Sequence, residues 1–140
     1  MVADIDGTVS DCRHRMHYVT SANPDWDAFF AEATNDPPLR RGMELVFEAA
    51  PGNRTVWLTG RPERFRVITV AWLAQHGLPV DMLYMRPNHD RRPVAEFKVA
   101  RILDIAAHFD IRLIVDDDDT VVTALRDRGW PVQQATWMPR

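Results

Sequence analysis

Acidic side chains follow two apolar stretches of this 140-residue sequence. The stretch "MVADIDG" carries Asp4 and Asp6 before a glycine, and "RLIVDDDD" ends in four successive aspartates, residues 116–119. Neighbouring carboxylates repel one another by about 1 kcal/mol per close pair even in water. Such a run is tolerated either as a solvated acidic loop or as a set of ligands for a cation. Carboxylate oxygens suit Mg²⁺, a hard cation that also binds phosphates.

The run of four aspartates divides in the middle. Asp116 and Asp117 follow the apolar residues directly, whereas Asp118 and Asp119 precede "TVVTALRDRG", whose apolar residues recur at helical spacing. Acidic residues at the start of a helix cap its free N–H groups and favour its dipole. We therefore expect the first pair to face a cation and the second pair to cap a helix.

Two further polar groups occupy positions suited to an anion. Thr59, Gly60 and Arg61 follow the apolar stretch "RTVWL" and precede a helix predicted to begin at Pro62. A hydroxyl group and the free N–H groups of a helix N-terminus bind anions such as phosphate. Lys98 lies in the first turns of another predicted helix and supplies a positive charge. Together with the carboxylates, these groups predict phosphoryl chemistry.

The elements that must position these residues alternate along the chain. Periodicity and turn residues predict strands over 1–7, 54–60, 80–85, 111–115 and 131–136, and helices over 25–33, 41–50, 62–77, 93–109 and 120–129. This alternation indicates an α/β fold with a parallel sheet. In such sheets ligands bind at the carboxyl ends of the strands, which is where the polar residues fall.

Composition narrows the class of protein. A length of 140 residues predicts one domain, and a net charge of −3 argues against coating nucleic acid or membrane by bulk charge. The single cysteine, Cys12, excludes an internal disulfide framework and a cysteine-rich zinc site. The sequence has no 18-residue apolar run and no signal peptide, so we expect no membrane span, and the lone unpaired cysteine fits a cytoplasmic location.

The segments "DIDGT", "LTGR", Lys98 and "LIVDD", in this order, resemble the four motifs of haloacid dehalogenase (HAD) superfamily phosphatases. The resemblance implies a Rossmann-like three-layer core with a parallel central sheet and a minimal cap. Residues 1–140 would form a single HAD-like phosphatase domain, with residues 11–50 as a small helical cap-like insert. The expected enzyme is a phosphoric monoester hydrolase.

The resemblance also implies catalytic roles. Asp4 would be the nucleophile that forms an aspartyl-phosphate. Asp6 would be the general acid for the leaving group and then the base for the hydrolytic water. Thr59 would hydrogen-bond the phosphoryl group, and Lys98 would bridge that group to Asp4. Gly60, Arg61 and Arg86 are candidates for substrate binding.

The implied cofactor is Mg²⁺. Its ligands would be Asp4, the backbone carbonyl of Asp6 and the carboxylate of Asp117, with Asp116 alongside. Mg²⁺, Lys98 and backbone N–H groups would supply the charge neutralisation that attack by one anion on another requires.

Further segments resemble the phosphatase domain of polynucleotide kinase–phosphatase, which removes 3'-phosphates from DNA or RNA ends during repair. These segments are "DCRHR", "NPDWDAFF", "LTGRPERFRVITVAWLAQHG", "LYMRPNHDRRPVAEFK" and "GWPVQQA". The sequence contains no GxxxxGK[ST] stretch for ATP phosphates. Because only three residues precede Asp4, which is short for a central strand, we expect a kinase or ligase domain encoded upstream or separately.

Two other functions stay open at this point. One keeps the chemistry but acts on nucleotides or other small phosphate esters. The other is a phospho-accepting receiver module, which also uses clustered aspartates, a threonine, a lysine and Mg²⁺. The receiver is disfavoured, because its acid pair comes at the first strand and its lysine near the end, whereas here Lys98 precedes the late acid pair.

Several basic and aromatic residues have two interpretations each. Arg13, His14 and Arg15 either contact a nucleic-acid backbone or form a solvated face. Arg91 and Arg92 either bind substrate or, with Arg86 and Asp90, form a salt-bridge cluster. Trp26, Phe29 and Phe30 form either part of the core, which is favoured, or a platform for base stacking.

Overall fold

Five parallel strands form the centre of the structure, a computed structural model that describes residues 1–139. They are β1 (Val2–Ala3), β2 (Val56–Pro62), β3 (Met82–Arg86), β4 (Ile114–Asp116) and β5 (Val132–Gln134). Their order across the sheet is β3-β2-β1-β4-β5, and every neighbouring pair is parallel. The predicted α/β fold with a parallel central sheet is confirmed.

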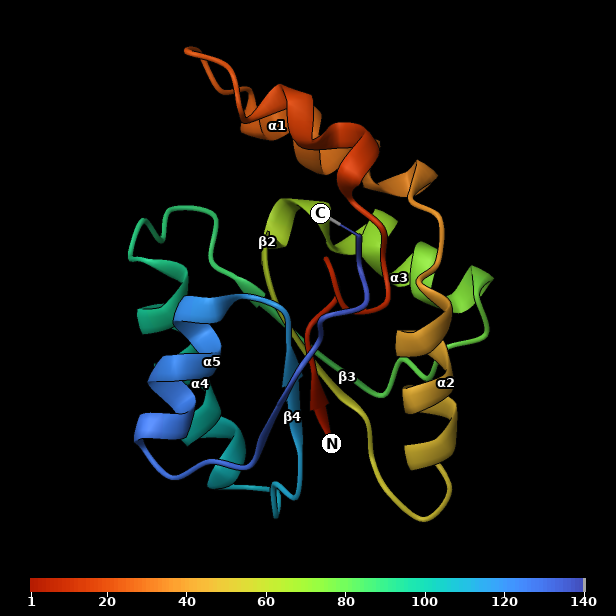
Figure 1. Cartoon of the computed structure of the whole chain (residues 1–140), viewed down its shortest axis with the longest axis vertical. Helices are drawn as coiled ribbons and strands as arrows, with labels where there is room; N and C mark the ends of the chain where they lie inside the picture. The colour runs from red at the N-terminus through yellow and green to blue at the C-terminus, as the bar shows by residue number, and fades with distance from the viewer. Residues whose placement is uncertain (140) are drawn as a thin grey trace.

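Helices cover both faces of this sheet (Figure 1). Helices α4 (Val94–Ala106) and α5 (Asp119–Asp127) lie on one face, and α2 (Arg40–Ala49) and α3 (Arg66–Gln75) lie on the other. Helix α1 (Trp26–Ala31) stands beyond one end of the sheet, flanked in sequence by the 3₁₀ helices η1 (Arg13–Tyr18) and η2 (Glu32–Asn35). A third 3₁₀ helix, η3 (Glu63–Phe65), precedes α3.

Alternation along the strands divides the core into two layers. Val2, Val56 and Ile114 belong to a buried cluster with residues of α4 and α5. The next residues along β1 and β2, Ala3 and Trp57, belong to a second cluster with residues of α2 and α3. Successive side chains of a strand point to opposite faces, so a two-residue central strand contributes to both layers.

The helix predicted to begin at Pro62 starts later than expected, which corrects the prediction. Strand β2 continues to Pro62, which pairs with Arg86 of β3 after an irregularity in register. Pro62 is extended, with ψ of 148°, and only the short η3 intervenes before α3 begins at Arg66. The end of α3 matches the prediction, since Gly77 follows it with a positive φ of 71°.

The segment predicted as a cap-like insert, residues 11–50, contains two kinds of structure. Helix α2 packs against the sheet, with Val46 in the core. The preceding part, with η1, α1 and η2, lies beyond the end of the sheet (Figure 1). None of the helices within residues 1–139 combines the length and apolar character needed to cross a membrane.

Candidate active site

Lys98 joins two buried carboxylates at the carboxyl ends of β1 and β4. Its Nζ donates to Asp4 Oδ1 at 2.8 Å and to Asp116 Oδ2 at 2.6 Å. All three residues are buried. Burial would lower the pKa of Lys98, but the charges of Asp116 and Asp4 outweigh it and raise that pKa. Lys98 is therefore a fixed positive charge between the first and last acidic motifs.

Asp4, Asp116 and Asp117 form a compact acidic cluster. One carboxylate oxygen from each lies within 4.8 Å of the others. Burial, followed by the negative charge of Asp116, raises the pKa of Asp4 and also raises the pKa of Asp117, to about 6. One lysine faces three carboxylates, so the cluster keeps excess negative charge in a low-dielectric site. This oxygen-rich donor set fits a hard divalent cation such as Mg²⁺.

Gly7 allows the first motif to approach the last. Its backbone has φ of +78°, a conformation that favours glycine. A Cβ atom at this position would lie 2.1 Å from Asp117 Oδ2, well inside van der Waals contact. Both the turn after Asp6 and the closeness of Asp117 therefore require glycine.

The carboxylate of Asp6 is held by two arginines. Arg61 donates from Nε to Asp6 Oδ2 at 3.0 Å and from Nη2 to Oδ1 at 2.7 Å, and Arg15 Nη2 also pairs with Oδ1. Burial would raise the pKa of Asp6, but the charges of Arg61 and Arg15 hold it well below its usual range. The Asp6 side chain is not among the carboxylates of the acidic cluster, so its predicted metal contact concerns its backbone carbonyl only.

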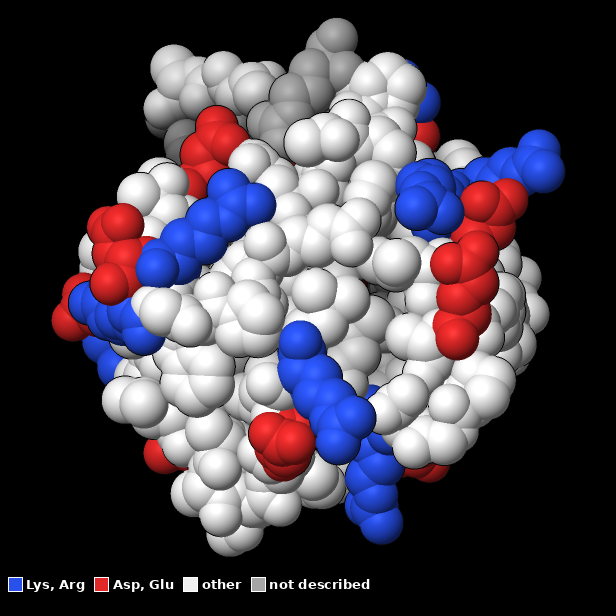
Figure 2. Space-filling view, turned by 60° about the horizontal axis from the view of Figure 1, so that its bottom comes forward, with Lys and Arg blue, Asp and Glu red and all other residues white. Residues whose placement is uncertain are grey.

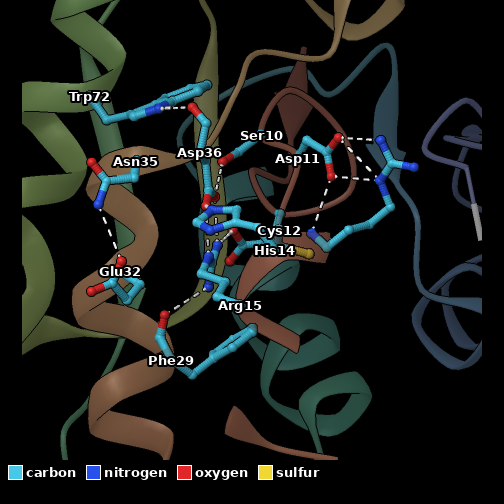
Figure 3. A network of polar contacts seen from close by, with 12 residues as sticks. Ser10, Asp11, Cys12, His14, Arg15, Phe29, Glu32, Asn35, Asp36 and Trp72 are labelled. Carbon is cyan, nitrogen blue, oxygen red and sulfur yellow. Dashed lines mark hydrogen bonds and ion pairs between the residues drawn. The ribbon is translucent and has the colours of Figure 1, made fainter. Parts of the chain in front are cut away.

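A buried network around Asp36 fixes Arg15 (Figure 3). Arg15 donates to both Asp36 oxygens, from Nε at 2.8 Å and from Nη2 at 2.7 Å. His14 Nε2 lies 2.7 Å from Asp36 Oδ1, and Ser10 Oγ donates to Oδ2. The indole of Trp72 donates to the backbone carbonyl of Asp36 at 2.9 Å. Asp36 thus connects helix α3 to Arg15 and, through Arg15, to Asp6.

The sequence did not identify Arg15 or Asp36 as members of the site. Arg15 is fully buried and paired with Asp6 and Asp36, so it fits neither the solvated face nor the nucleic-acid contact that the sequence suggested, whereas Arg13 is half-exposed and pairs with Asp11 at 2.7 Å. Asp36 precedes two prolines in a segment without periodicity, so no pattern distinguished it. The only sequence signal for Arg15 was its position in "CRHR", shortly after the first motif.

Thr59, Gly60 and Arg61 lie at the end of β2 beside this arrangement. Thr59 is buried, and its Oγ1 accepts from Arg61 N at 3.1 Å. Since α3 begins only at Arg66, the residues directly after Arg61 belong to the end of β2 and to the short 3₁₀ helix η3, and not to the α-helix that was expected there. The guanidinium of Arg61 is engaged with Asp6 and with Thr69 Oγ1, at 3.1 Å from the latter. Its direct contact with substrate stays a prediction.

A pocket of about 260 Å³ opens over these groups. Residues of all four motifs border it: Asp4, Asp6, Gly60, Arg61, Lys98, Asp116 and Asp117. Arg86, the remaining candidate for substrate binding, borders it as well. The pocket therefore joins the nucleophile candidate, the acidic cluster and the Asp6–arginine arrangement in one space.

The two later aspartates begin helix α5, as predicted, although Asp118 also borders the pocket. Asp118 is the N-cap residue, and its Oδ1 accepts from Thr120 N at 2.8 Å and from Val121 N at 3.2 Å. Asp119 is the first residue of α5 and pairs with the side-chain amide of Gln134. Neither belongs to the acidic cluster of the described residues.

Two comparisons with known proteins found matches. A family model described as the polynucleotide kinase PNKP phosphatase domain matches residues 1–137. A solved chain of the Pnkp1/Rnl/Hen1 complex is 25% identical, with a TM-score of 0.81, over 96% of this chain and 44% of that chain. A chain of the Pnkp1/Rnl/Hen1 RNA repair complex is 24% identical, with a TM-score of 0.78, over 95% and 40%.

A class C acid phosphatase from Bacillus anthracis is 17% identical, with a TM-score of 0.69, over 92% of this chain and 60% of that chain. This likeness supports the shared fold. The search of curated proteins gave no match. The chain thus spans less than half the length of the two repair-complex chains.

Proposed function

The chain belongs to the family of PNKP phosphatase domains, a HAD-type phosphoric monoester hydrolase family, and on this premise we propose a Mg²⁺-dependent 3'-phosphatase of nucleic-acid ends. The family membership confirms the predicted resemblance and removes the reason for a receiver module. The single observation that carries the proposal is the bridge from Lys98 to Asp4 and Asp116 beside Asp117.

Asp4 is the proposed nucleophile. An Asp4 oxygen attacks phosphorus, the bond from phosphorus to the 3' oxygen breaks, and the electron pair leaves with that oxygen. Lys98 holds Asp4 by a 2.8 Å hydrogen bond, and its positive charge favours the ionised carboxylate that attacks, against the burial and the charge of Asp116 that raise the pKa of Asp4. The same ammonium group offsets part of the charge that gathers when a phosphate dianion approaches a carboxylate.

Asp4, Asp116, Asp117 and the backbone carbonyl of Asp6 are the proposed ligands of Mg²⁺. When bound, the cation neutralises phosphate oxygens and orients the phosphoryl group. The fit rests on the cluster itself, whose burial and mutual repulsion raise the pKa of Asp4 and of Asp117.

Asp6 is the proposed proton-transfer group. It gives a proton to the leaving 3' oxygen in the first step and takes one from the water that hydrolyses the aspartyl-phosphate. The two arginines favour the ionised form that accepts a proton, whereas the like charge of a bound phosphate favours the protonated form. Arg61 and Arg15 are positioning residues, since both contact Asp6 and Arg61 also contacts Thr69.

The proposed substrate is a polynucleotide with a 3'-phosphate. The family description and the 25% identity to a chain of the Pnkp1/Rnl/Hen1 complex support a nucleic-acid end over a small metabolite. We further propose that the domain works beside a kinase or ligase component in the cytoplasm. Phosphatase action on free nucleotides is the competing outcome of the test below.

The test is a phosphate-release assay on 3'-phosphorylated oligonucleotides of DNA and of RNA, beside a panel of mononucleotides. We expect Mg²⁺-dependent release from an oligonucleotide, silenced by EDTA and restored by added Mg²⁺. Turnover of mononucleotides alone would contradict the nucleic-acid substrate while leaving the chemistry intact. The Asp4→Asn protein is the matched control, because it should release no phosphate from any of these substrates.

A further inference from the structure

A second hollow, of about 440 Å³, adjoins the catalytic pocket. The two share Trp26, Phe30, Gly60, Arg86 and Val94, so they form one continuous surface. We name this second hollow the aromatic–arginine groove and define it by Trp26, Phe30, Arg64, Arg86, Arg91 and Arg92. Its volume falls within the roughly 300–1,000 Å³ typical of ligand pockets.

One wall of the groove is a pair of stacked rings from α1. The rings of Trp26 and Phe30 lie 6.0 Å apart at an angle of 28°. Trp26 is 52% exposed, whereas Phe29 is buried beneath it. Phe29 is therefore the core residue of this aromatic segment, and Trp26 presents its indole to the groove. An exposed indole backed by a second ring is a surface on which a nucleobase stacks.

The rest of the groove lining is strongly basic. Four arginines line the groove, and Asp90 is the acidic residue among them. Asp90 is engaged with Arg92 at 2.7 Å and lies 3.9 Å from Arg86. Arg91 is exposed and makes no hydrogen bond or ion pair with any part of the chain that the structure describes. Arg86 Nε is buried and lacks a hydrogen-bond partner.

The opposite end of the molecule differs. Figure 2 turns forward the lower end of Figure 1, where the chain begins, and shows Lys and Arg side chains scattered among Asp and Glu on a mostly uncharged surface. The groove beside the catalytic pocket combines an exposed stacked aromatic pair with two arginines that have free donors, Arg86 and Arg91. Its other two arginines are paired, Arg64 with Asp27 and Arg92 with Asp90. Charge complementarity and continuity with that pocket both point to an anionic, base-bearing ligand.

We propose that the aromatic–arginine groove holds the nucleotide that precedes the 3'-terminal one, in an unpaired strand. This inference rests on the proposed function, which puts the terminal phosphate in the catalytic pocket. The base of the preceding nucleotide stacks on Trp26, and Arg86 and Arg91 bind the phosphodiester that links the two nucleotides. Stacking requires an unpaired base, so the groove selects single-stranded ends of at least two nucleotides.

The first measurement is kcat/KM for 3'-phosphorylated DNA and RNA strands of one, two, four and six nucleotides, with p-nitrophenyl phosphate as a substrate that reaches only the catalytic pocket. We expect the largest increase between one and two nucleotides. Pairing the hexanucleotide to a complement that leaves a blunt end should lower kcat/KM. Equal values for one and six nucleotides, or a preference for the blunt duplex, would overturn the proposal even if p-nitrophenyl phosphate is hydrolysed.

The second measurement uses variants of the two walls. Trp26→Ala should reduce the ratio of hexanucleotide to mononucleotide kcat/KM by roughly 5- to 150-fold, the range corresponding to ~1–3 kcal/mol per stacked base. Trp26→Phe should retain most of that ratio. Phe47→Ala is the matched control, because Phe47 is an exposed aromatic residue of α2 that does not line the groove. An unchanged ratio in Trp26→Ala would overturn the stacking role.

Arg91→Gln tests the basic wall without disturbing a contact within the described chain. Each lost phosphate contact should reduce the slope of log affinity against log salt by about 0.7 for a single strand. The affinity of the Asp4→Asn protein for the 3'-phosphorylated hexanucleotide supplies this slope with no turnover, with and without Arg91→Gln. If the oligonucleotide binds in a Trp26-dependent manner but is not hydrolysed, the proposed function is contradicted while binding in the groove is supported. Hydrolysis together with a salt slope that Arg91→Gln leaves unchanged would support the proposed function and contradict the phosphate contact of Arg91.

Discussion

Arg61 donates hydrogen bonds to both carboxylate oxygens of Asp6, from Nε to Oδ2 at 3.0 Å and from Nη2 to Oδ1 at 2.7 Å. Asp6 lies in the turn that follows β1, and Arg61 lies near the end of the neighbouring parallel strand β2, 55 positions later in the sequence. A planar guanidinium that binds in this two-pronged manner fixes both the position and the orientation of a carboxylate. The orientation of the proposed proton-transfer group therefore depends on Arg61.

Arg61→Lys should impair substrates with poor leaving groups more than substrates with good ones. An ammonium group keeps a positive charge but loses the two-pronged contact, so Asp6 no longer aims its proton at the leaving oxygen. Positioned acid–base catalysis contributes about 10²–10⁴-fold. We expect a loss approaching that range for a 3'-phosphorylated oligonucleotide and a smaller loss for p-nitrophenyl phosphate, both read from kcat. Equal losses for the two substrates would indicate a merely structural role.

Asp4→Asn should abolish hydrolysis while the protein stays folded. An amide cannot form the acyl phosphate, so no covalent intermediate accumulates. The measurements are phosphate release, circular dichroism, and intact mass after acid quench with substrate. Asp104→Asn serves as control, since Asp104 is exposed and lies outside the catalytic pocket. Appreciable turnover by the Asp4→Asn protein would contradict the covalent route.

Mg²⁺ should stabilise the chelator-treated protein, and Asp117→Asn should remove that effect. A ligand that binds only the folded state at 100 times its Kd adds about 2.7 kcal/mol to the free energy of unfolding. Asp119→Asn is the matched control, because Asp119 follows in the same run but begins α5 outside the acidic cluster. Urea denaturation with and without Mg²⁺ gives the increment for each protein. Loss of the increment in Asp119→Asn and its retention in Asp117→Asn would reverse the assignment of ligands.

Gly7→Ala should destroy activity, whereas Gly52→Ala should not. Both glycines have positive φ, 78° and 75°, so alanine costs roughly 1–2 kcal/mol of stability at either position. Only at Gly7 does the added Cβ collide with Asp117, while nothing lies within 4 Å at Gly52. Because both variants share the backbone strain, the difference between them in kcat and in Mg²⁺-dependent stabilisation measures the effect of the collision with Asp117. Equal behaviour would show that backbone strain alone explains the effect.

The parallel fold and the acidic cluster were predictable because local patterns carry them. Apolar runs that end in polar residues locate strand ends, and parallel strands bring those ends to one edge. The end of α3 at Gly77 and the capping role of Asp118 follow from equally local signals. These predictions needed no knowledge of which side chains meet across the sheet.

The sequence could not reveal the partners of Asp6. Arg15 and Asp36 are charged residues in segments without periodicity, and burying either one is favourable only because the other is there. The late start of α3 has a similar cause, since the pairing of Pro62 with Arg86 extends β2 beyond its predicted end. Both features depend on contacts between distant segments, which local propensity does not encode.

The ion pair between Lys98 and Asp4 also links the activity of the pocket to the folding of the chain. Its two residues are 94 positions apart, and Asp116 lies a further 18 positions beyond Lys98. Contacts of such long range form slowly, because loop-closure entropy opposes them until the intervening elements are in place. During refolding, regained turnover should therefore follow the recovery of helical signal with a delay. Activity in this domain therefore requires the complete topology, and partly folded chains should not hydrolyse substrate.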